Sequence, residues 1–248
     1  MKRKIKSSLR HLRRTVAPPF WPISRKELVW TVKPKPGPHP ITRSLPLGIV
    51  LRDILGYAFS MKEARRILAE RKISVDGRIV TDYKFPIGLM DVIHVIPEDK
   101  YYRVVPDRTN KFKLVEISKE EAGYKLARVI RKQTVTGGAL QITLHDGRNI
   151  IFSKEQTSTL PNIRTLDSVV ITVPRQSLVR HLPLKEGMLA VVTEGRHTGF
   201  IGRVESIQQV FKRKDSIVVL KNNNGETVRT VLEYVLPVGD EKPVLSLG

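Results

Sequence analysis

The sequence predicts an α+β protein with several small domains behind a basic N-terminal extension. At 248 residues, the chain exceeds the usual size of one domain. Its apolar residues recur at helical spacing between residues 47 and 68 but form short strand-like runs after Asp107. Residues 1–43 contain 12 Lys and Arg residues and one acidic residue. We therefore expect an extension over 1–43, a small α/β domain over 44–106, a β-rich central domain over 107–174 and a small β-barrel domain over 175–248.

The composition restricts the class of partner. The net charge is +20 and the pI is about 10.3, which favours nucleic acid, an anionic membrane or another acidic polymer as the partner. The absence of cysteine excludes disulfides, thiolate catalysis and zinc fingers. No apolar run approaches the roughly 20 residues of a membrane-spanning helix, so we expect no membrane partner. Residues 1–16 are rich in arginine and free of acids, which leaves an organelle transit peptide as an alternative.

The extension has two parts. Residues 2–14 are compatible with a short helix, but without acidic residues it would repel itself until a polyanion screened it. Residues 17–40 are rich in proline and should be extended, with Trp21 and Trp30 either packed on the neighbouring domain or stacked on a base. The candidate RNA contacts here are Lys2, Arg3, Lys4, Lys6, Arg10, Arg13, Arg14 and Arg43.

The α/β domain begins with two helices that should pack together, one over 47–55 and one over 60–72. In the second, Ser60 and Glu63 have the spacing of a capping box. Its apolar and basic residues fall on opposite sides, and the Asp76-Gly77 turn follows it. We expect a surface for a rigid polyanion, although ordinary solvated charge is the alternative. Its candidate contacts are Lys62, Arg65, Arg66, Lys72 and Arg78.

Short strands separated by turn dipeptides dominate the rest of the chain. Strands are predicted at 111–117, 129–136, 140–144, 149–152, 217–220 and 227–232. Gly137-Gly138 and Asp146-Gly147 occupy the places of hairpin turns, which indicates small antiparallel barrels or meanders. His145 and Asp146 would be an acid–base pair, but we expect them on an exposed turn without a nucleophile. No catalytic residue is predicted.

Part of the α/β domain resembles a known module. The matching residues are Ser60, Lys62, Glu63, Ala64 and Arg65, then Val75 to Arg78, Gly88, and Asp91 to Val95. Together they are similar to the S-four-type (alpha-L) RNA-binding domain. That domain occurs in ribosomal proteins, pseudouridine synthases and tyrosyl-tRNA synthetases, so it implies RNA binding without choosing among these hosts.

Two further stretches extend the resemblance. His11 to Arg14, Ala17-Pro18, Trp21, Lys35 to Pro40 and Ser44 to Leu47 resemble the start of the ribosomal protein S-four-e family, and the 137–149 region resembles its central segment. Residues 186–204 resemble a KOW motif, with Arg196, His197 and Arg203 as contact candidates. Its glycines either shape a barrel turn or let the backbone approach RNA. Their spacing fits neither a P-loop nor a dinucleotide fingerprint.

The order of these segments implies a structural protein of the small ribosomal subunit, located in the cytoplasm on the ribosome. Its expected partners are small-subunit ribosomal RNA and neighbouring ribosomal proteins. We expect no enzymatic activity, cofactor, metal or small-molecule substrate. Two alternatives remain: an enzyme related to pseudouridine synthases, and a transcription elongation factor with a KOW motif. The enzyme would need a large catalytic sheet with an active-site Asp, whereas the last 140 or so residues indicate small β modules.

Overall fold

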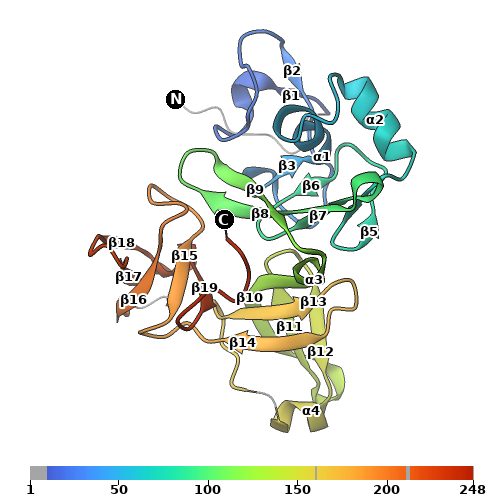
Figure 1. Cartoon of the computed structure of the whole chain (residues 1–248). Helices are drawn as coiled ribbons and strands as arrows, with labels where there is room; N and C mark the ends of the chain where they lie inside the picture. The colour runs from blue at the N-terminus through green and yellow to red at the C-terminus, as the bar shows by residue number, and fades with distance from the viewer. Residues whose placement is uncertain (1–9, 160, 211–212, 248) are drawn as a thin grey trace.

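Three five-stranded antiparallel sheets form most of the protein, with short helices at their edges (Figure 1). This is a computed structural model that describes residues 10–159, 161–210 and 213–247. The α+β class is confirmed. The first sheet lies beneath the N-terminal extension, the second at the opposite end of the molecule, and the third to one side of both.

The first sheet belongs to the predicted α/β domain. Its strand order is β5-β4-β7-β8-β9, and its strands are β4 Ile73–Val75, β5 Arg78–Ile79, β7 Val92–Val95, β8 Lys100–Asp107 and β9 Lys111–Ile117. The helices are α1 Leu47–Ile49, continued by a π-helical turn at Val50–Ile54, and α2 Met61–Ala69; a 3-10 turn follows at Ile96–Glu98. The expected boundary after residue 106 falls inside the β8–β9 hairpin. We therefore propose that this domain extends to Ile117.

The described part of the extension packs as part of this domain. The expectation that residues 2–14 stay loose without a polyanion is therefore wrong for residues 10–14. No helix over 2–14 forms in the described residues 10–14, where the chain enters strand β1. The elements are β1 Leu12–Arg13, the 3-10 turns Arg14–Val16 and Ile41–Arg43, β2 Trp30–Thr31, and β3 Leu45–Pro46 paired with β6 Pro86–Ile87. Residues 17–40 contain no helix, but they alternate between turns, bends and irregular chain around β2, so the expected extended strap is only partly present. Pairing with β2 satisfies backbone groups of β1 that a helix would satisfy internally.

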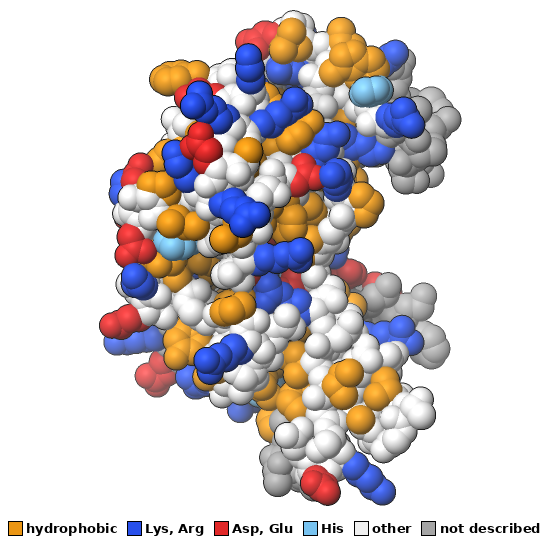
Figure 2. Space-filling model, turned by 90° about the vertical axis from the view of Figure 1, so that its right-hand side faces the viewer, with side chains coloured by type: hydrophobic (Ala, Val, Ile, Leu, Met, Phe, Trp, Pro, Cys, Tyr) orange, Lys and Arg blue, Asp and Glu red, His pale blue; other side chains and the backbone are white. Residues whose placement is uncertain are grey.

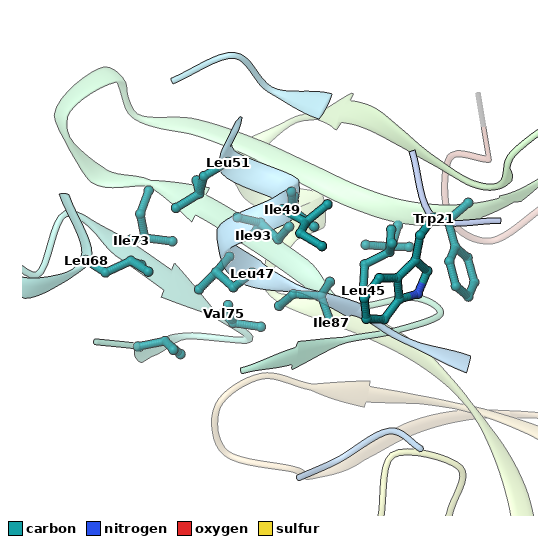
Figure 3. Close-up of a cluster of buried hydrophobic side chains, with 14 of the residues drawn as sticks. Trp21, Leu45, Leu47, Ile49, Leu51, Leu68, Ile73, Val75, Ile87 and Ile93 are labelled. Carbon is teal, nitrogen blue, oxygen red and sulfur yellow. The ribbon is translucent and has the colours of Figure 1, made fainter. Parts of the chain in front are cut away.

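Trp21 explains why the extension is held in place. Its ring is 3% exposed and lies among Leu45 and Ile87 at one end of the largest apolar core (Figure 3). The indole Nε1–H donates a hydrogen bond of 2.9 Å to the carbonyl of Ser44, which satisfies its one polar atom. Leu12 and Ala17 join the same core. The extension therefore contributes structure and not only charge.

The central domain is the second sheet, with order β12-β11-β10-β13-β14. Its elements are α3 Lys119–Ala122, β10 Tyr124–Thr134, a 3-10 turn Thr136–Gly138, β11 Leu140–Leu144, β12 Asn149–Phe152, α4 Lys154–Thr159, β13 Ser168–Thr172 and β14 Leu178–Leu182. Ser118 caps α3, since its hydroxyl accepts a hydrogen bond from the Glu121 amide at 3.3 Å. The predicted hairpins are present.

The last sheet has the order β18-β17-β16-β15-β19. Its elements are β15 Leu189–Val192, β16 Ile201–Gln208, a 3-10 turn Arg213–Asp215, β17 Ile217–Lys221, β18 Thr227–Val231, a 3-10 turn Leu232–Tyr234 and β19 Val235–Gly239. The following tail runs from β19 back toward the first sheet (Figure 1), and its Ser246 hydroxyl donates to Glu121 of α3 at 2.8 Å. One apolar core contains Met90, Leu126 and Leu236, one from each sheet region, so the three domains share packing.

A buried ionic cluster also joins the domains. The Lys125 ammonium lies 2.6 Å from Asp76 Oδ2, 2.6 Å from Asp91 Oδ1 and 3.0 Å from Asp146 Oδ2, and its side chain is fully buried. His39 from the extension contacts Asp91 at 3.0 Å. Burial opposes the charge of Lys125, but the three carboxylates prevail and raise its pKa. Burial likewise opposes ionisation of Asp91, whose pKa is nevertheless lowered by its cationic neighbours. The cluster therefore fixes the extension, the first domain and the central domain together.

The cluster corrects the expectation of an exposed His145-Asp146 turn. Asp146 is 3% exposed, and Arg148 bridges it to Asp76 with contacts of 3.1 and 2.7 Å. The His145 Nδ1 accepts from the Arg128 amide at 3.2 Å, and Nε2 lies 3.1 Å from the Leu89 carbonyl. Long-range partners bury Asp146 and half-bury His145, while Gly147 stays exposed, and a hairpin signal cannot reveal such partners.

We expect His145 to make the protein acid-sensitive. Burial and the nearby Lys125 charge lower the folded-state pKa of His145 to about 3, whereas an unfolded histidine has a pKa of about 6.5. Between these values the unfolded chain binds a proton that the folded chain does not, so the free energy of unfolding should decrease as the pH falls from 6.5. Urea unfolding at several pH values between 6.5 and 4.5 measures this slope. His145→Gln should flatten it, and an unchanged slope would contradict the assignment.

Candidate RNA-binding surface

Helix α2 presents the main group of basic residues. Its start is fixed by the predicted cap: the Ser60 hydroxyl accepts from the Glu63 amide at 3.2 Å, and the Glu63 carboxylate accepts from the Phe59 amide at 2.9 Å. Ala64 and Leu68 are buried against the core. The opposite side carries three exposed cations, Lys62, Arg65 and Arg66.

Aromatic packing holds one of these cations in a defined position. The Arg65 guanidinium lies 4.1 Å from the centre of the Tyr83 ring and donates to the Tyr83 hydroxyl at 2.8 Å. The Lys84 ammonium lies over the same ring at 5.6 Å. Sequence reasoning did not include Tyr83, although an aromatic residue beside a lysine in a polar stretch was a usable signal.

The cations near the end of α2 form ion pairs with an acidic residue. Arg66 and Lys72 pair with Glu70 at 3.1 and 2.6 Å, and these two neighbours lower the pKa of the Glu70 carboxyl. Exposed ion pairs of this kind contribute little to stability, so an RNA phosphate can replace the Glu70 carboxylate at a small cost in free energy. Within the part of the chain that the structure describes, Lys62, Arg71 and Arg78 form no ion pair.

Arg78 is positioned by the turn before it. Asp76 and Gly77 have φ values of 49° and 73°, as a two-residue hairpin turn requires. The Asp76 carboxylate accepts from the Val92 amide at 2.9 Å and joins the buried cluster, which immobilises the turn. Arg78 follows it, exposed, on β5. In Figure 1 α2 and β5 lie along the same edge, and Figure 2 shows blue Lys and Arg side chains spread over this side of the molecule.

Two predicted RNA contacts of the extension have partners within the chain. The Arg14 side chain is 7% exposed; it donates to the carbonyls of Trp30, at 3.2 Å, and Ser24. Arg43 contacts Glu194 at 2.6 Å and therefore ties the extension to the last domain. Arg10 and Arg13 are exposed. The candidates Lys2, Arg3, Lys4 and Lys6 lie outside the described residues.

The candidates in the last domain lie on a separate part of the molecule (Figure 1). Arg196 and Arg203 are exposed and His197 is half-buried. Gly199 has a φ of 83°, and a Cβ there would lie 2.8 Å from the Arg108 amide nitrogen of the β8–β9 hairpin. This glycine thus permits close packing within the chain.

The part of the chain that the structure describes lacks two features: a cluster of metal-binding side chains and a membrane-spanning helix. Among them, no group of three or more His, Asp or Glu side chains is arranged to hold a metal. None of the described helices is long and apolar enough to cross a bilayer.

Comparison with known proteins identifies the family. The model of the ribosomal family S4e matches residues 98–178, the RS4NT (NUC023) domain matches residues 6–42, and the S4 domain matches residues 47–93. The small ribosomal subunit protein eS4 of Ignicoccus hospitalis is 46% identical over 96% of this chain and 94% of its own length. The eS4 protein of Pyrobaculum aerophilum is 48% identical over 96% and 99%. The chain belongs to the ribosomal protein S4e family.

A solved structure agrees with this S4e assignment. The 30S ribosomal protein S4e from Thermoplasma acidophilum matches with a TM-score of 0.67 and 28% identity, over 83% of this chain and 99% of that chain. The S4 domain match covers α2, where the exposed cations lie. The last of the three matched ranges ends at residue 178. The KOW interpretation of residues 186–204 therefore stays a hypothesis.

Proposed function

We propose that this chain is a structural constituent of the small ribosomal subunit that binds ribosomal RNA and performs no chemistry. The observation that carries the proposal is its identity of 46–48% over 96% of its length with proteins named small ribosomal subunit protein eS4. The exposed cations of α2 and the turn at Arg78 support RNA as the ligand. Recognition would rest on phosphate positions and RNA shape, because side chains cannot read the narrow major groove of an RNA helix.

The proposed partners are small-subunit ribosomal RNA and adjacent ribosomal proteins, and the proposed location is the cytoplasmic ribosome. Sedimentation of cell extract at physiological salt tests the assignment. We expect the protein to migrate with small subunits. Recovery at the top of the gradient, or with RNA polymerase, would contradict it, and tritium release from ribosomal RNA would indicate an enzyme instead.

We predict that charge reversal on α2 weakens RNA binding specifically. The triple variant Lys62→Glu, Arg65→Glu and Arg66→Glu should bind ribosomal RNA at least tenfold more weakly, because about three phosphate contacts are lost. The slope of log affinity against log salt should become shallower by about 2 to 3. Filter binding at several salt concentrations between about 50 and 300 mM measures both the affinity and the slope, because log affinity falls linearly with log salt concentration.

The matched control is a triple variant with the same change in net charge. Lys221, Arg229 and Lys242 are exposed residues of the last domain and its tail, away from α2. Their reversal to Glu should leave the affinity closer to that of the wild type. Equal losses in the two variants would show that total charge, and not the α2 surface, determines binding.

A further inference from the structure

The β1–β2 ribbon of the extension exposes an aromatic ring that the proposed RNA surface does not include. Arg13 pairs with Trp30 across the two strands, and Leu12 next to Arg13 is buried. Because side chains alternate along a strand, His11, Arg13 and Trp30 share the outer face of the ribbon. Trp30 is 52% exposed, whereas the other tryptophan, Trp21, is 3% exposed.

The ring has cationic and aromatic neighbours that leave part of its surface free. The Arg13 guanidinium lies 5.8 Å from the centre of the Trp30 ring, and the His11 ring lies 5.5 Å away at a tilt of 52°. The site therefore offers an apolar face and positive charge together.

Buried contacts hold the ribbon in one conformation. The Arg14 Nε donates to the Trp30 carbonyl at 3.2 Å, and the Arg14 amide donates to the Val29 carbonyl at 3.0 Å. Arg14 itself is buried, and Leu12 lies in the main core. The ring is thus presented on a supported backbone, so that little conformational entropy is lost when a ligand packs on it.

We propose that Trp30 is a stacking platform for an unpaired nucleobase, with Arg13 contacting the adjacent phosphate. The inference rests on the proposed function, since it requires RNA as the partner. A nucleotide fits because it combines a flat π-face with a negative charge. The charges nearby favour it over a basic or purely apolar protein segment: the described part of the extension up to Thr31 has five basic residues, and its one acid, Glu27, lies 3.7 Å from Arg14.

Two short RNA probes separate base stacking from phosphate attraction. The first is a single-stranded octamer of adenylate, and the second is an abasic octamer with the same number of phosphates. In low salt, the adenylate octamer should quench the fluorescence of the full-length protein, whereas the abasic octamer should not. Trp21 is buried and supplies a constant background. Trp30→Phe should abolish the quenching and keep most of the affinity, because it retains a ring.

Affinity provides a second readout. Trp30→Leu should weaken binding of the adenylate octamer about fivefold and leave binding of the abasic octamer unchanged. Tyr124→Leu is the matched control, because Tyr124 is a 41% exposed aromatic residue on β10 of the central domain, outside the ribbon and α2, and its loss should have little effect. The urea midpoint of each variant confirms that it folds, as expected for a half-exposed position.

Equal quenching by both octamers would overturn the platform, and so would wild-type affinity of Trp30→Leu for the adenylate octamer. If such a Trp30→Leu protein also failed to enter small subunits, a protein neighbour on the ring would be indicated. If the wild type bound whole ribosomal RNA but neither octamer responded, the platform would be wrong and the proposed function would stand. If the wild type bound no RNA at all, the proposed function itself would fail.

Discussion

Lys125→Met is expected to lower the free energy of unfolding by about 3–5 kcal/mol, because it removes the buried cation shared by three carboxylates. The carboxylates of Asp76, Asp91 and Asp146 are each within 3.0 Å of the ammonium and at most 7% exposed. Arg148 contacts two of them and His39 the third, which leaves fewer positive than negative groups once Lys125 is gone. The urea midpoint at pH 7 measures the loss.

An exposed cation provides the control. Lys119 pairs with Asp99 at 3.0 Å on the surface, and Lys119→Met should leave the midpoint unchanged. Adding Asp91→Asn or Asp146→Asn to Lys125→Met should restore part of the stability, because each removes an unpaired buried charge. If Lys125→Met alone had the wild-type urea midpoint, the cluster would not stabilise the fold.

Local patterns predicted the parts of this protein that depend on neighbours in sequence. The cap of α2, its separation of apolar and basic sides, and the hairpin turns follow from residues a few positions apart. The resemblance to the S4e family also came from strings of adjacent residues, and it is confirmed.

The buried cluster could not be predicted in this way. His39 and Asp91 are 52 positions apart and Lys125 and Asp76 are 49 apart, so neither pairing leaves a periodic signal. Charged residues are rarely buried without a partner, which made the surface the reasonable expectation for Asp146 and Arg14. The two tryptophans show the same limit. Composition indicated that each needs burial or a stacking partner, but only the fold distinguishes buried Trp21 from exposed Trp30.

We expect deletion of residues 2–40 to abolish cooperative unfolding, although the basic, proline-rich sequence of this segment alone would suggest a dispensable arm. The deletion removes Trp21 and Leu12 from the main core and His39 from the ionic cluster. Truncation of a buried Trp alone costs about 3–5 kcal/mol, which is comparable to the whole stability of many domains. Thermal unfolding monitored by circular dichroism tests this, and a retained sharp transition at the wild-type temperature would restore the arm interpretation.

Deletion of residues 2–9 separates charge from structure. It removes Lys2, Arg3, Lys4 and Lys6 but keeps every described contact of the extension. We therefore expect wild-type unfolding together with weaker binding of ribosomal RNA, and a salt slope shallower by about 3 if all four cations contact phosphates. The same titration on a variant with these four residues changed to Gln should give the same slope. An unchanged slope in both would mean that the phosphate contacts come from α2 and the folded domains alone.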